Sequence, residues 1–261
     1  MIGFCPLASG SKGNALYLGT DKTKILIDAG LSGKQIRERL LQIGVALEEI
    51  DAILITHEHG DHIEGLKILS AKMGISVFAN METAKGIYQS LHFLPTFKIF
   101  STNESFSFRD LTIFPFSVQH DTPDPVGFVI EACGKKIGIC SDLGFVTSLL
   151  KKNLSGLDYL YIEANHEPSM VMASNRSSLH KQRVLGRQGH LSNEESAELI
   201  ASVWHPKLKH VYLAHLSQEC NSEIVAKKRV EELLHQHALP VKISIAYQEK
   251  ISDRIRFDVE E

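Results

Sequence analysis

Short apolar runs, separated by segments rich in glycine and charged residues, dominate the hydrophobic pattern of this chain. Runs of this length favour buried β-strands over helices. The predicted strands are Gly3–Leu7, Asn14–Gly19, Lys24–Asp28, Ala52–Thr56, Ser76–Ala79, Lys98–Phe100, Leu111–Phe116, Gly127–Ala132, Lys136–Ser141, Tyr159–Glu163, Val211–His215 and Lys242–Tyr247. The predicted helices are Ser32–Gln42, Glu64–Met73, Met81–Leu91, Asn193–Val203 and Ser222–His237.

The order of these elements predicts two similar halves that meet face to face. Strands come first, helices follow, and the same order is then repeated. Two stacked sheets with helices outside bury both faces of each sheet. We therefore expect an α+β fold of four αββα layers with two mixed sheets. A chain of 261 residues with 43% hydrophobic content can bury a sizeable core, so we expect residues 1–261 to form a single domain.

Charge and cysteine content narrow the class of protein. The net charge of −3 argues against a protein that coats nucleic acid indiscriminately. The cysteines form no C-x-x-C pair and the sequence shows no signal peptide, so we expect reduced thiols in a cytoplasmic protein. No apolar stretch approaches membrane-spanning length, so no membrane partner is expected. The sequence leaves the oligomeric state open.

Most of the chemical information lies in the segment His57-Glu58-His59-Gly60-Asp61-His62. It follows a predicted strand, and residues two apart in an extended backbone point the same way, so His57 and His59 can bind one ion. A turn at Gly60 would direct the last two residues toward a second ion. A single zinc needs only three or four ligands, so this density of donors predicts a two-metal site. The alternative is a polar loop with ordinary surface histidines.

The spacing H-x-H-x-D-H after a strand resembles that of the metallo-β-lactamase superfamily of binuclear metallohydrolases. The resemblance implies the metallo-β-lactamase fold, with metals held by loops at one edge and further ligands downstream. His120, Asp142 and His215 follow predicted strands in the expected order. Asp28 matches an aspartate that orients a ligating imidazole in this family. Drug-hydrolysing members typically carry Cys in place of Asp142, which argues against β-lactam hydrolysis.

These candidates can be divided between two ions. One metal would bind His57, His59 and His120, and the other would bind Asp61, His62 and His215. Asp142 would bridge them, because a carboxylate has two oxygens whereas an imidazole has one free donor nitrogen. A shared water would lose a proton near neutral pH and act as the nucleophile, which places Asp61 and Asp142 among the catalytic residues. The donor set suits two Zn²⁺ or Mn²⁺ ions per chain, and iron is also compatible.

A Gly- and Ser-rich turn, Ser9–Asn14, joins the first two predicted strands. Its glycines permit close approach of the backbone, and its amides and hydroxyls suit phosphate oxygens. A tight hairpin turn that binds nothing is the alternative. The candidate substrate-binding residues here are Ser9, Ser11, Lys12 and Asn14.

The segment from Pro168 to Asn193 is basic and contains no Asp or Glu. Its cations, Arg176, Lys181, Arg183 and Arg187, lie between two metal motifs, where a polyanion could be held. A solvated basic loop is the alternative. We take Arg183 and Arg187 as candidate substrate contacts.

A predicted helix begins just after this basic segment. Ser192 and Glu195 have capping-box spacing, so the helix would direct its first amides toward an anion. His190 would lie at the mouth of this helix, where it could bind phosphate or protonate a leaving oxygen. A purely structural histidine is the alternative.

Further segments resemble the bacterial YycJ/WalJ-type branch of the superfamily, and this resemblance covers nearly the whole chain. They are Ser9–Asn14, Glu163–His166, Lys181–Gly186 and Gly189–Glu194. That branch is associated with 5′-to-3′ exonuclease activity on DNA, so the resemblance implies a nucleic acid substrate. It also makes Asn165, His166 and Asn193 candidate substrate-binding residues, with a hydrogen-bonding role expected for His166.

We therefore predict a binuclear metal-dependent hydrolase that cleaves phosphodiester bonds as a 5′-to-3′ DNA exonuclease. The alternative is a small-molecule hydrolase, such as a hydroxyacylglutathione-type thioesterase. That enzyme would need a basic pocket near the C-terminus, for which Lys227-Lys228-Arg229 is only a weak candidate. A non-hydrolytic protein would be expected to alter the first metal motif, which is intact here.

Overall fold

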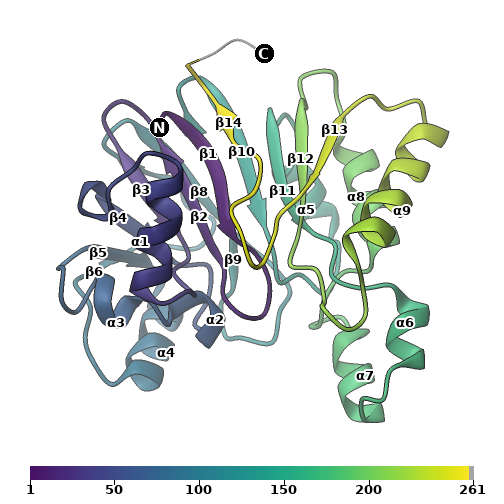
Figure 1. Ribbon diagram of the computed structural model, residues 1–261, viewed down its shortest axis with the longest axis horizontal. Coiled ribbons are helices and arrows are strands. Elements are labelled where there is room, and N and C mark those ends of the chain that lie inside the picture. Colours follow the sequence, from purple (N-terminus) through teal and green to yellow (C-terminus); the bar gives the residue numbers. More distant parts are fainter. Residues whose placement is uncertain (259–261) are drawn as a thin grey trace.

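The computed structural model describes residues 1–258 and contains two seven-stranded sheets stacked against each other (Figure 1). The first sheet consists of β1 (Gly3–Ala8), β2 (Ala15–Gly19), β3 (Lys24–Ile27), β4 (Ala52–Leu54), β5 (Ser76–Ala79), β6 (Phe97–Ile99) and β14 (Ile255–Arg256). Its spatial order is β14-β1-β2-β3-β4-β5-β6. The pairs from β14 to β3 are antiparallel and the pairs from β3 to β6 are parallel.

The second sheet repeats this arrangement. It consists of β7 (Phe106–Phe108), β8 (Leu111–Ser117), β9 (Val126–Ala132), β10 (Lys135–Cys140), β11 (Tyr159–Glu163), β12 (His210–Ala214) and β13 (Lys242–Ile245), in the order β13-β12-β11-β10-β9-β8-β7. The pairs from β7 to β10 are antiparallel and those from β10 to β13 are parallel. Each sheet is therefore mixed, as predicted, and the two halves share one topology.

Helices cover the outer face of each sheet (Figure 1). The first sheet carries α1 (Gly33–Gln42), α2 (Gly60–Ile63), α3 (Leu66–Leu69) and α4 (Met81–Leu91), with a short 3₁₀ helix at Leu47–Glu49. The second carries α5 (Ser148–Asn153), α8 (Asn193–Val203) and α9 (Glu223–Gln236). Two further short helices, α6 (Pro168–Ala173) and α7 (Ser178–Val184), project beside the lower edge of the second sheet (Figure 1). The predicted αββα layering is confirmed.

The core is divided into three apolar layers, one between the sheets and one under each set of helices. Strand alternation explains the division, because successive side chains point to opposite faces. Tyr161 of β11 lies between the sheets, whereas its neighbours Leu160 and Ile162 pack under the helices. Both faces of the central strands are buried, which is why the sequence shows continuous apolar runs.

The predicted helix Glu64–Met73 is found only in part, because helix α3 covers Leu66–Leu69 and a separate one-turn helix, α2, ends before Glu64. The carbonyl of Asp61, which would accept the helical bond from Gly65, instead accepts a bond of 2.7 Å from the amide of Asn14. The Gly65 amide donates to the carbonyl of Ala29 at 2.7 Å. Contacts to neighbouring loops therefore replace continuous helix here. Within residues 1–258, no helix is long and apolar enough to span a membrane.

Candidate metal centre and active site

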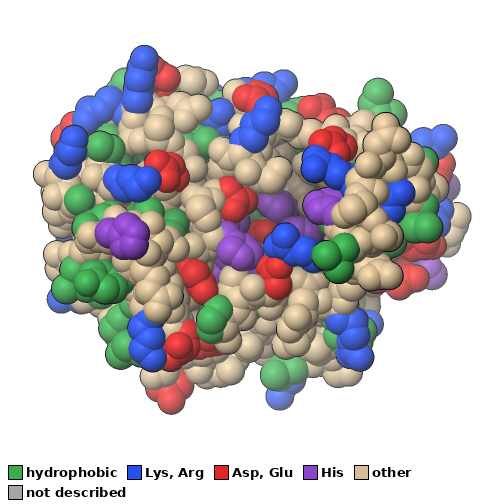
Figure 2. Space-filling model, turned by 90° about the horizontal axis from the view of Figure 1, so that it is seen from below, with side chains coloured by type: hydrophobic (Ala, Val, Ile, Leu, Met, Phe, Trp, Pro, Cys, Tyr) green, Lys and Arg blue, Asp and Glu red, His purple; other side chains and the backbone are tan. Residues whose placement is uncertain are grey.

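Polar residues from both sheets meet at the lower edge of the sandwich, where the parallel strands end. In the view from below, histidine side chains gather in a central hollow with charged groups around it (Figure 2). Most of the residues come from the ends of strands or the loops that follow them, whereas Asp61 and His62 lie in α2 and His190 lies between α7 and α8. In chain order they are Asp28, His57, His59, Asp61, His62, His120, Asp142, Glu163, His190 and His215. The predicted ligand set is thus brought together in space.

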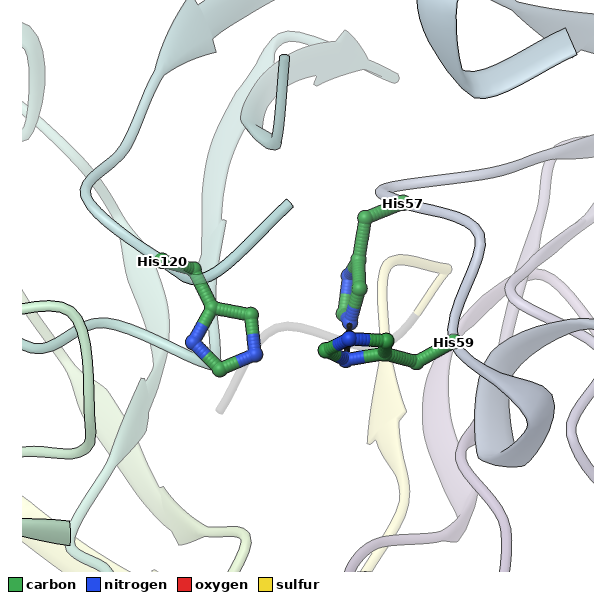
Figure 3. Close-up of side chains that lie close together, drawn as sticks. All are labelled: His57, His59 and His120. Atoms are coloured by element: carbon green, nitrogen blue, oxygen red, sulfur yellow. Dashed lines mark hydrogen bonds between the residues drawn. The ribbon is translucent and has the colours of Figure 1, made fainter. Parts of the chain in front are cut away.

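His57, His59 and His120 form one cluster, with their rings turned toward one another (Figure 3). His57 Nε2 lies 3.1 Å from His59 Nδ1. The ring centroid of His120 lies 5.2 Å from that of His57 and 5.1 Å from that of His59. His120 comes from the second sheet, so this group joins the two halves of the molecule.

Asp61, His62 and His215 form a second cluster. Asp61 Oδ2 lies 3.7 Å from His62 Nε2 and 3.8 Å from His215 Nε2. Here again the first two residues follow β4 and the third follows β12 of the other sheet. A second ion would therefore also be held by both halves.

Asp142 lies between the two clusters. Its Oδ2 is 3.3 Å from His62 Nε2, and its Oδ1 is 3.5 Å from His215 Nε2 and 3.8 Å from His120 Nε2. Burial alone would raise the pKa of Asp142, but the charges of His215 and His62 outweigh burial and hold that pKa well below its usual value. A buried carboxylate that reaches both clusters has the position of a bridging ligand.

The spacing of these atoms fits divalent metal ions. A tetrahedral zinc with bonds of about 2.0–2.1 Å separates its ligand atoms by about 3.3 Å, close to the distances found here. Asp142 Oδ2 and His215 Nε2 are buried, yet neither has a hydrogen-bond partner within the described chain. Buried polar atoms are normally satisfied, so atoms left without partners and facing one another are expected of ligands.

Neighbouring groups fix the orientation of the ligating rings. Asp28 Oδ2 lies 2.8 Å from His62 Nδ1, which leaves His62 Nε2 facing the centre. Asp28 is itself held by the amide and hydroxyl of Thr56, at 2.9 Å each. His120 Nδ1 lies 3.3 Å from the carbonyl of Gly189. Such outer contacts set the tautomer and direction of a metal-binding imidazole.

Glu163 is a site residue that the sequence prediction missed. It is fully buried, and its Oε1 lies 2.6 Å from His190 Nδ1 and 3.0 Å from His215 Nδ1. Burial alone would raise the pKa of Glu163, but the charge of His190 and hydrogen bonds to it and to His215 lower it to about 2. Because Glu163 ends a buried strand, as the predicted ligands do, its position was a signal that could have identified it.

The Ser9–Asn14 turn mainly supports the site. Ser9 is buried, and its hydroxyl oxygen accepts hydrogen bonds of 2.7 Å from the Tyr161 hydroxyl and from the amide of His215. Asn14 Nδ2 donates to Asp61 Oδ2 at 3.3 Å. Lys12 is exposed and pairs with Glu249 at 3.3 Å. Ser11 lines a cavity that contains His190 and His215, and Ser9 lines a neighbouring cavity.

The residues implied by the branch resemblance are buried near the site. Asn165 Nδ2 donates to the carbonyl of His215 at 2.7 Å. His166 is 1% exposed, and its Nδ1 has no hydrogen-bond partner among residues 1–258. Asn193 is fully buried, and its side-chain amide exchanges hydrogen bonds of 3.1 and 2.8 Å with that of Asn221. Asn165 and Asn193 thus brace the loops around His215 and His190.

The basic segment borders the hollow through an ion pair that was not predicted. Arg183 Nη2 lies 2.6 Å from Asp121 Oδ2, while Asp121 Oδ1 lies 3.2 Å from His120 Nε2. The Arg187 guanidinium lies 3.9 Å from the ring centroid of Phe145. Both arginines line a cavity of 500 Å³ beside Gln119 and Asp121. Asp121 follows a predicted ligand directly, which was the available signal for it.

A second cavity has a volume of 260 Å³. His190 and His215 line it together with polar residues of the α6–α7 region and the loop after β12. The side chain of His190 is 21% exposed, more than those of Glu163 and His215 that it contacts. His190 is therefore open to a molecule bound in this cavity.

The sequence and the fold both match known proteins. Residues 23–216 match the family described as "Beta-lactamase superfamily domain". The exodeoxyribonuclease YycJ of Bacillus anthracis is 35% identical over 240 residues, which cover 91% of each chain. The exodeoxyribonuclease WalJ of Streptococcus pneumoniae is 37% identical over 241 residues, covering 91% of this chain and 90% of that one. The crystal structure of the metallo-β-lactamase fold protein YhfI from Bacillus subtilis superimposes with a TM-score of 0.70 at 14% identity, covering 96% and 99% of the two chains.

Proposed function

The chain belongs to the β-lactamase superfamily and is a metal-dependent hydrolase, and we propose that it removes nucleotides from the 5′ end of DNA by a two-metal mechanism. The similarity to two exodeoxyribonucleases over nine-tenths of the chain supports this substrate. When bound, two divalent ions, Zn²⁺ or Mn²⁺, would neutralise the scissile phosphate and lower the pKa of the attacking water. The free cysteines are compatible with the cytoplasm as the site of action.

The Glu163–His190 pair is the observation that carries the proposal. The bond to be broken joins the phosphorus to the 3′ oxygen of the terminal nucleotide, and this alkoxide is a poor leaving group unless it receives a proton. Burial alone would lower the pKa of His190, but the charge of Glu163 and a hydrogen bond to it raise that pKa above its usual value. His190 is thus kept protonated beside Asp142, where it can deliver that proton.

The balance of the reaction follows from these positions. The oxygen of water adds to the phosphorus, the bond from phosphorus to the 3′ oxygen breaks, and His190 donates its proton to that oxygen. The proton that the attacking water loses passes to the solvent, from which His190 is protonated again. The released nucleotide keeps a 3′ hydroxyl, and the shortened strand keeps the phosphate. Glu163 acts as a positioning residue, because it holds both His190 and the ligand His215 through one oxygen. Arg183 and Arg187 would hold the backbone of the remaining strand.

A thioesterase is less compatible with the site. A thiolate leaves without a proton, so a thioesterase would not need a histidine such as His190. The basic residues near the C-terminus are already neutralised on the surface, because Lys227, Lys228 and Arg229 each pair with a glutamate. They do not form a pocket for the carboxylates of glutathione.

The test is an activity panel with zinc, manganese and iron(II) on three substrates: a 5′-phosphorylated oligodeoxynucleotide, bis(p-nitrophenyl) phosphate and a glutathione thioester. We expect stepwise shortening of the oligonucleotide from its 5′ end. His190→Ala should lower that rate by roughly 10²–10⁴-fold while metal content is retained. Hydrolysis of bis(p-nitrophenyl) phosphate should fall much less, because p-nitrophenolate leaves without a proton.

His235→Ala, which changes an exposed histidine on α9, serves as the matched control and should leave all rates unchanged. Hydrolysis of the thioester without cleavage of any phosphodiester would overturn the proposal. Loss of metal from the His190→Ala variant would show instead that His190 is a ligand.

A further inference from the structure

The largest cavity at this edge adjoins the proposed active site. It has a volume of 610 Å³ and lies between the loop from β12 to α9 and the segment that follows β13. Leu216, Ser217 and Gln218 line both this cavity and the 260 Å³ cavity that contains His190 and His215. The two cavities therefore adjoin each other along this loop. The volume of the larger cavity is within the usual range of small-ligand sites, about 300–1,000 Å³.

The walls of the larger cavity are suited to an uncharged, flat group. Ile245, Ala246 and Tyr247 line one side, and Ile224, at the first turn of α9, is 79% exposed. An exposed aliphatic side chain of this size beside a cavity indicates a surface that a ligand can cover. Glu223, Glu249 and Lys250 also line the cavity, and Glu249 pairs with Lys12, so the cavity carries little net charge. The cavity lined by Arg183, Arg187 and Asp121 keeps a net positive charge.

Hydrogen bonds to neighbouring segments hold the wall of the larger cavity in place. Buried Arg39 donates from Nη1 to the carbonyl of Gln248 at 3.0 Å. The Gln248 side chain donates to the carbonyl of Gly13 at 3.0 Å and accepts from the amide of Lys12 at 2.8 Å. The cavity is thereby tied to the Ser9–Asn14 turn that supports Asp61 and His215. Preformed walls reduce the ordering cost of binding.

We propose that this cavity binds the base of the 5′-terminal nucleotide. This proposal rests on the nuclease function proposed above. His190 and His215 line the smaller cavity, so a terminal nucleotide held there lies beside Leu216 and Ser217, and its base reaches the larger cavity past these two residues. Ile224 offers apolar surface to the base, whereas the Tyr247 ring borders the same space with Lys250 Nζ 4.0 Å from its centroid. The Gln218 side chain makes no hydrogen bond within residues 1–258 and can form one with the polar edge of the base.

The experiment compares two 5′-phosphorylated oligonucleotides that differ only at the first residue, which carries either thymine or an abasic tetrahydrofuran. With the wild-type holoenzyme, the KM for release of the first residue should be lower for the thymine substrate than for the abasic substrate by roughly fivefold or more, because one base stacked on protein contributes that much. The kcat should be similar for the two substrates. Ile224→Ser and Gln218→Ala should each raise KM for the thymine substrate and leave the abasic substrate unchanged.

Leu149→Ser is the matched control. Leu149 is 57% exposed, occupies the same second helical position in α5 as Ile224 does in α9, and lines neither cavity. It should leave both substrates unchanged. Equal KM values for the two substrates on the wild type, or a thymine preference that both cavity variants retain, would overturn the base site while leaving the nuclease function intact. Failure of every metal form to cleave either oligonucleotide would overturn both proposals.

Discussion

Three residues of the candidate site have a left-handed backbone. Asp28, Asp142 and His215 have φ values of 59°, 55° and 52°, and each lies at or just beyond the end of a buried strand. Asp, Asn and His enter this region more readily than β-branched residues, although the conformation still carries strain of about 1 kcal/mol or more. At these positions the chain therefore requires a residue that tolerates the turn and whose side chain either is a candidate ligand, as in Asp142 and His215, or orients one, as in Asp28.

Asp142→Asn tests whether the negative charge of residue 142, and not its shape, is needed to bind both metal ions. Asparagine keeps the size and the left-handed tolerance of aspartate, but its amide nitrogen cannot bind a metal ion. We expect about two metal equivalents in the saturated wild type, one or fewer in the variant, and loss of hydrolysis with unchanged circular dichroism. Elemental analysis gives the stoichiometry, with Asp21→Asn, an exposed change, as the control. Two retained equivalents would exclude a bridge.

At the scale of elements, three loops from neighbouring strands are packed into one support for the metal ligands. The amide of Ala29 donates to the carbonyl of His62 at 2.8 Å, and the amide of Asn14 donates to the carbonyl of Asp61 at 2.7 Å. Gly30 lies against the same backbone, since a Cβ on Gly30 would be 1.6 Å from the carbonyl oxygen of Asp61. The ligand loop can adopt its position only because residue 30 has no side chain.

Gly30→Ala should therefore weaken metal binding although residue 30 is not a ligand. The methyl group would displace the backbone of Asp61, and small displacements of ligands lower affinity steeply. We expect at least a tenfold higher dissociation constant for zinc in competition with a chelator. Gly60→Ala is the control, because Gly60 lies in the ligand motif itself, yet a Cβ added there would have no atom of its surroundings within 4 Å. Equal affinities for the two variants would contradict this account.

The sequence predicted elements well where burial imposed a pattern. The strand ending at His215 and the capped helix starting at Asn193 are found as expected, because a buried strand and a capping box leave local signals. Helix α7 has no buried residue, so no apolar period marked it. The positions of Glu163, at the end of a strand, and Asp121, beside a predicted ligand, were local signals, but their partners His190 and Arg183 lie in distant segments and could not be predicted. The predicted turn at Gly60 is the first turn of α2.

At the scale of the whole molecule, the edge opposite the metal centre contains a buried histidine, His210, whose ring nitrogens make no hydrogen bond within the described residues. His210 begins β12, is 1% exposed, and stacks on Tyr212 with ring centroids 4.5 Å apart. Neither of its ring nitrogens has a hydrogen-bond partner within the described residues. Burial first, and the charge of Lys242 second, lower the pKa of His210 to about 4. The folded protein thus keeps this ring neutral where the unfolded chain would protonate it.

This difference predicts acid sensitivity of the whole fold. Because the folded pKa lies below the unfolded value, stability is complete above about pH 6.5 and is lost as pH falls toward 4. Between pH 7 and pH 5, the free energy of unfolding of the wild type should fall by about 2 kcal/mol more than that of His210→Phe. Urea denaturation with a chelator present measures this without a contribution from metal release. Parallel pH profiles for the two proteins would disprove the assignment.

Each proposed metal cluster takes ligands from both halves of the chain, and this makes the ions internal cross-links. His57 and His59 follow a strand of the first sheet, whereas His120, Asp142 and His215 follow strands of the second. Away from this edge the two sheets adhere through apolar contacts such as that of Phe4 with Tyr161 and Tyr212. Neither half can then unfold alone without releasing the ions, so metal occupancy would merge two similar halves into one cooperative unit.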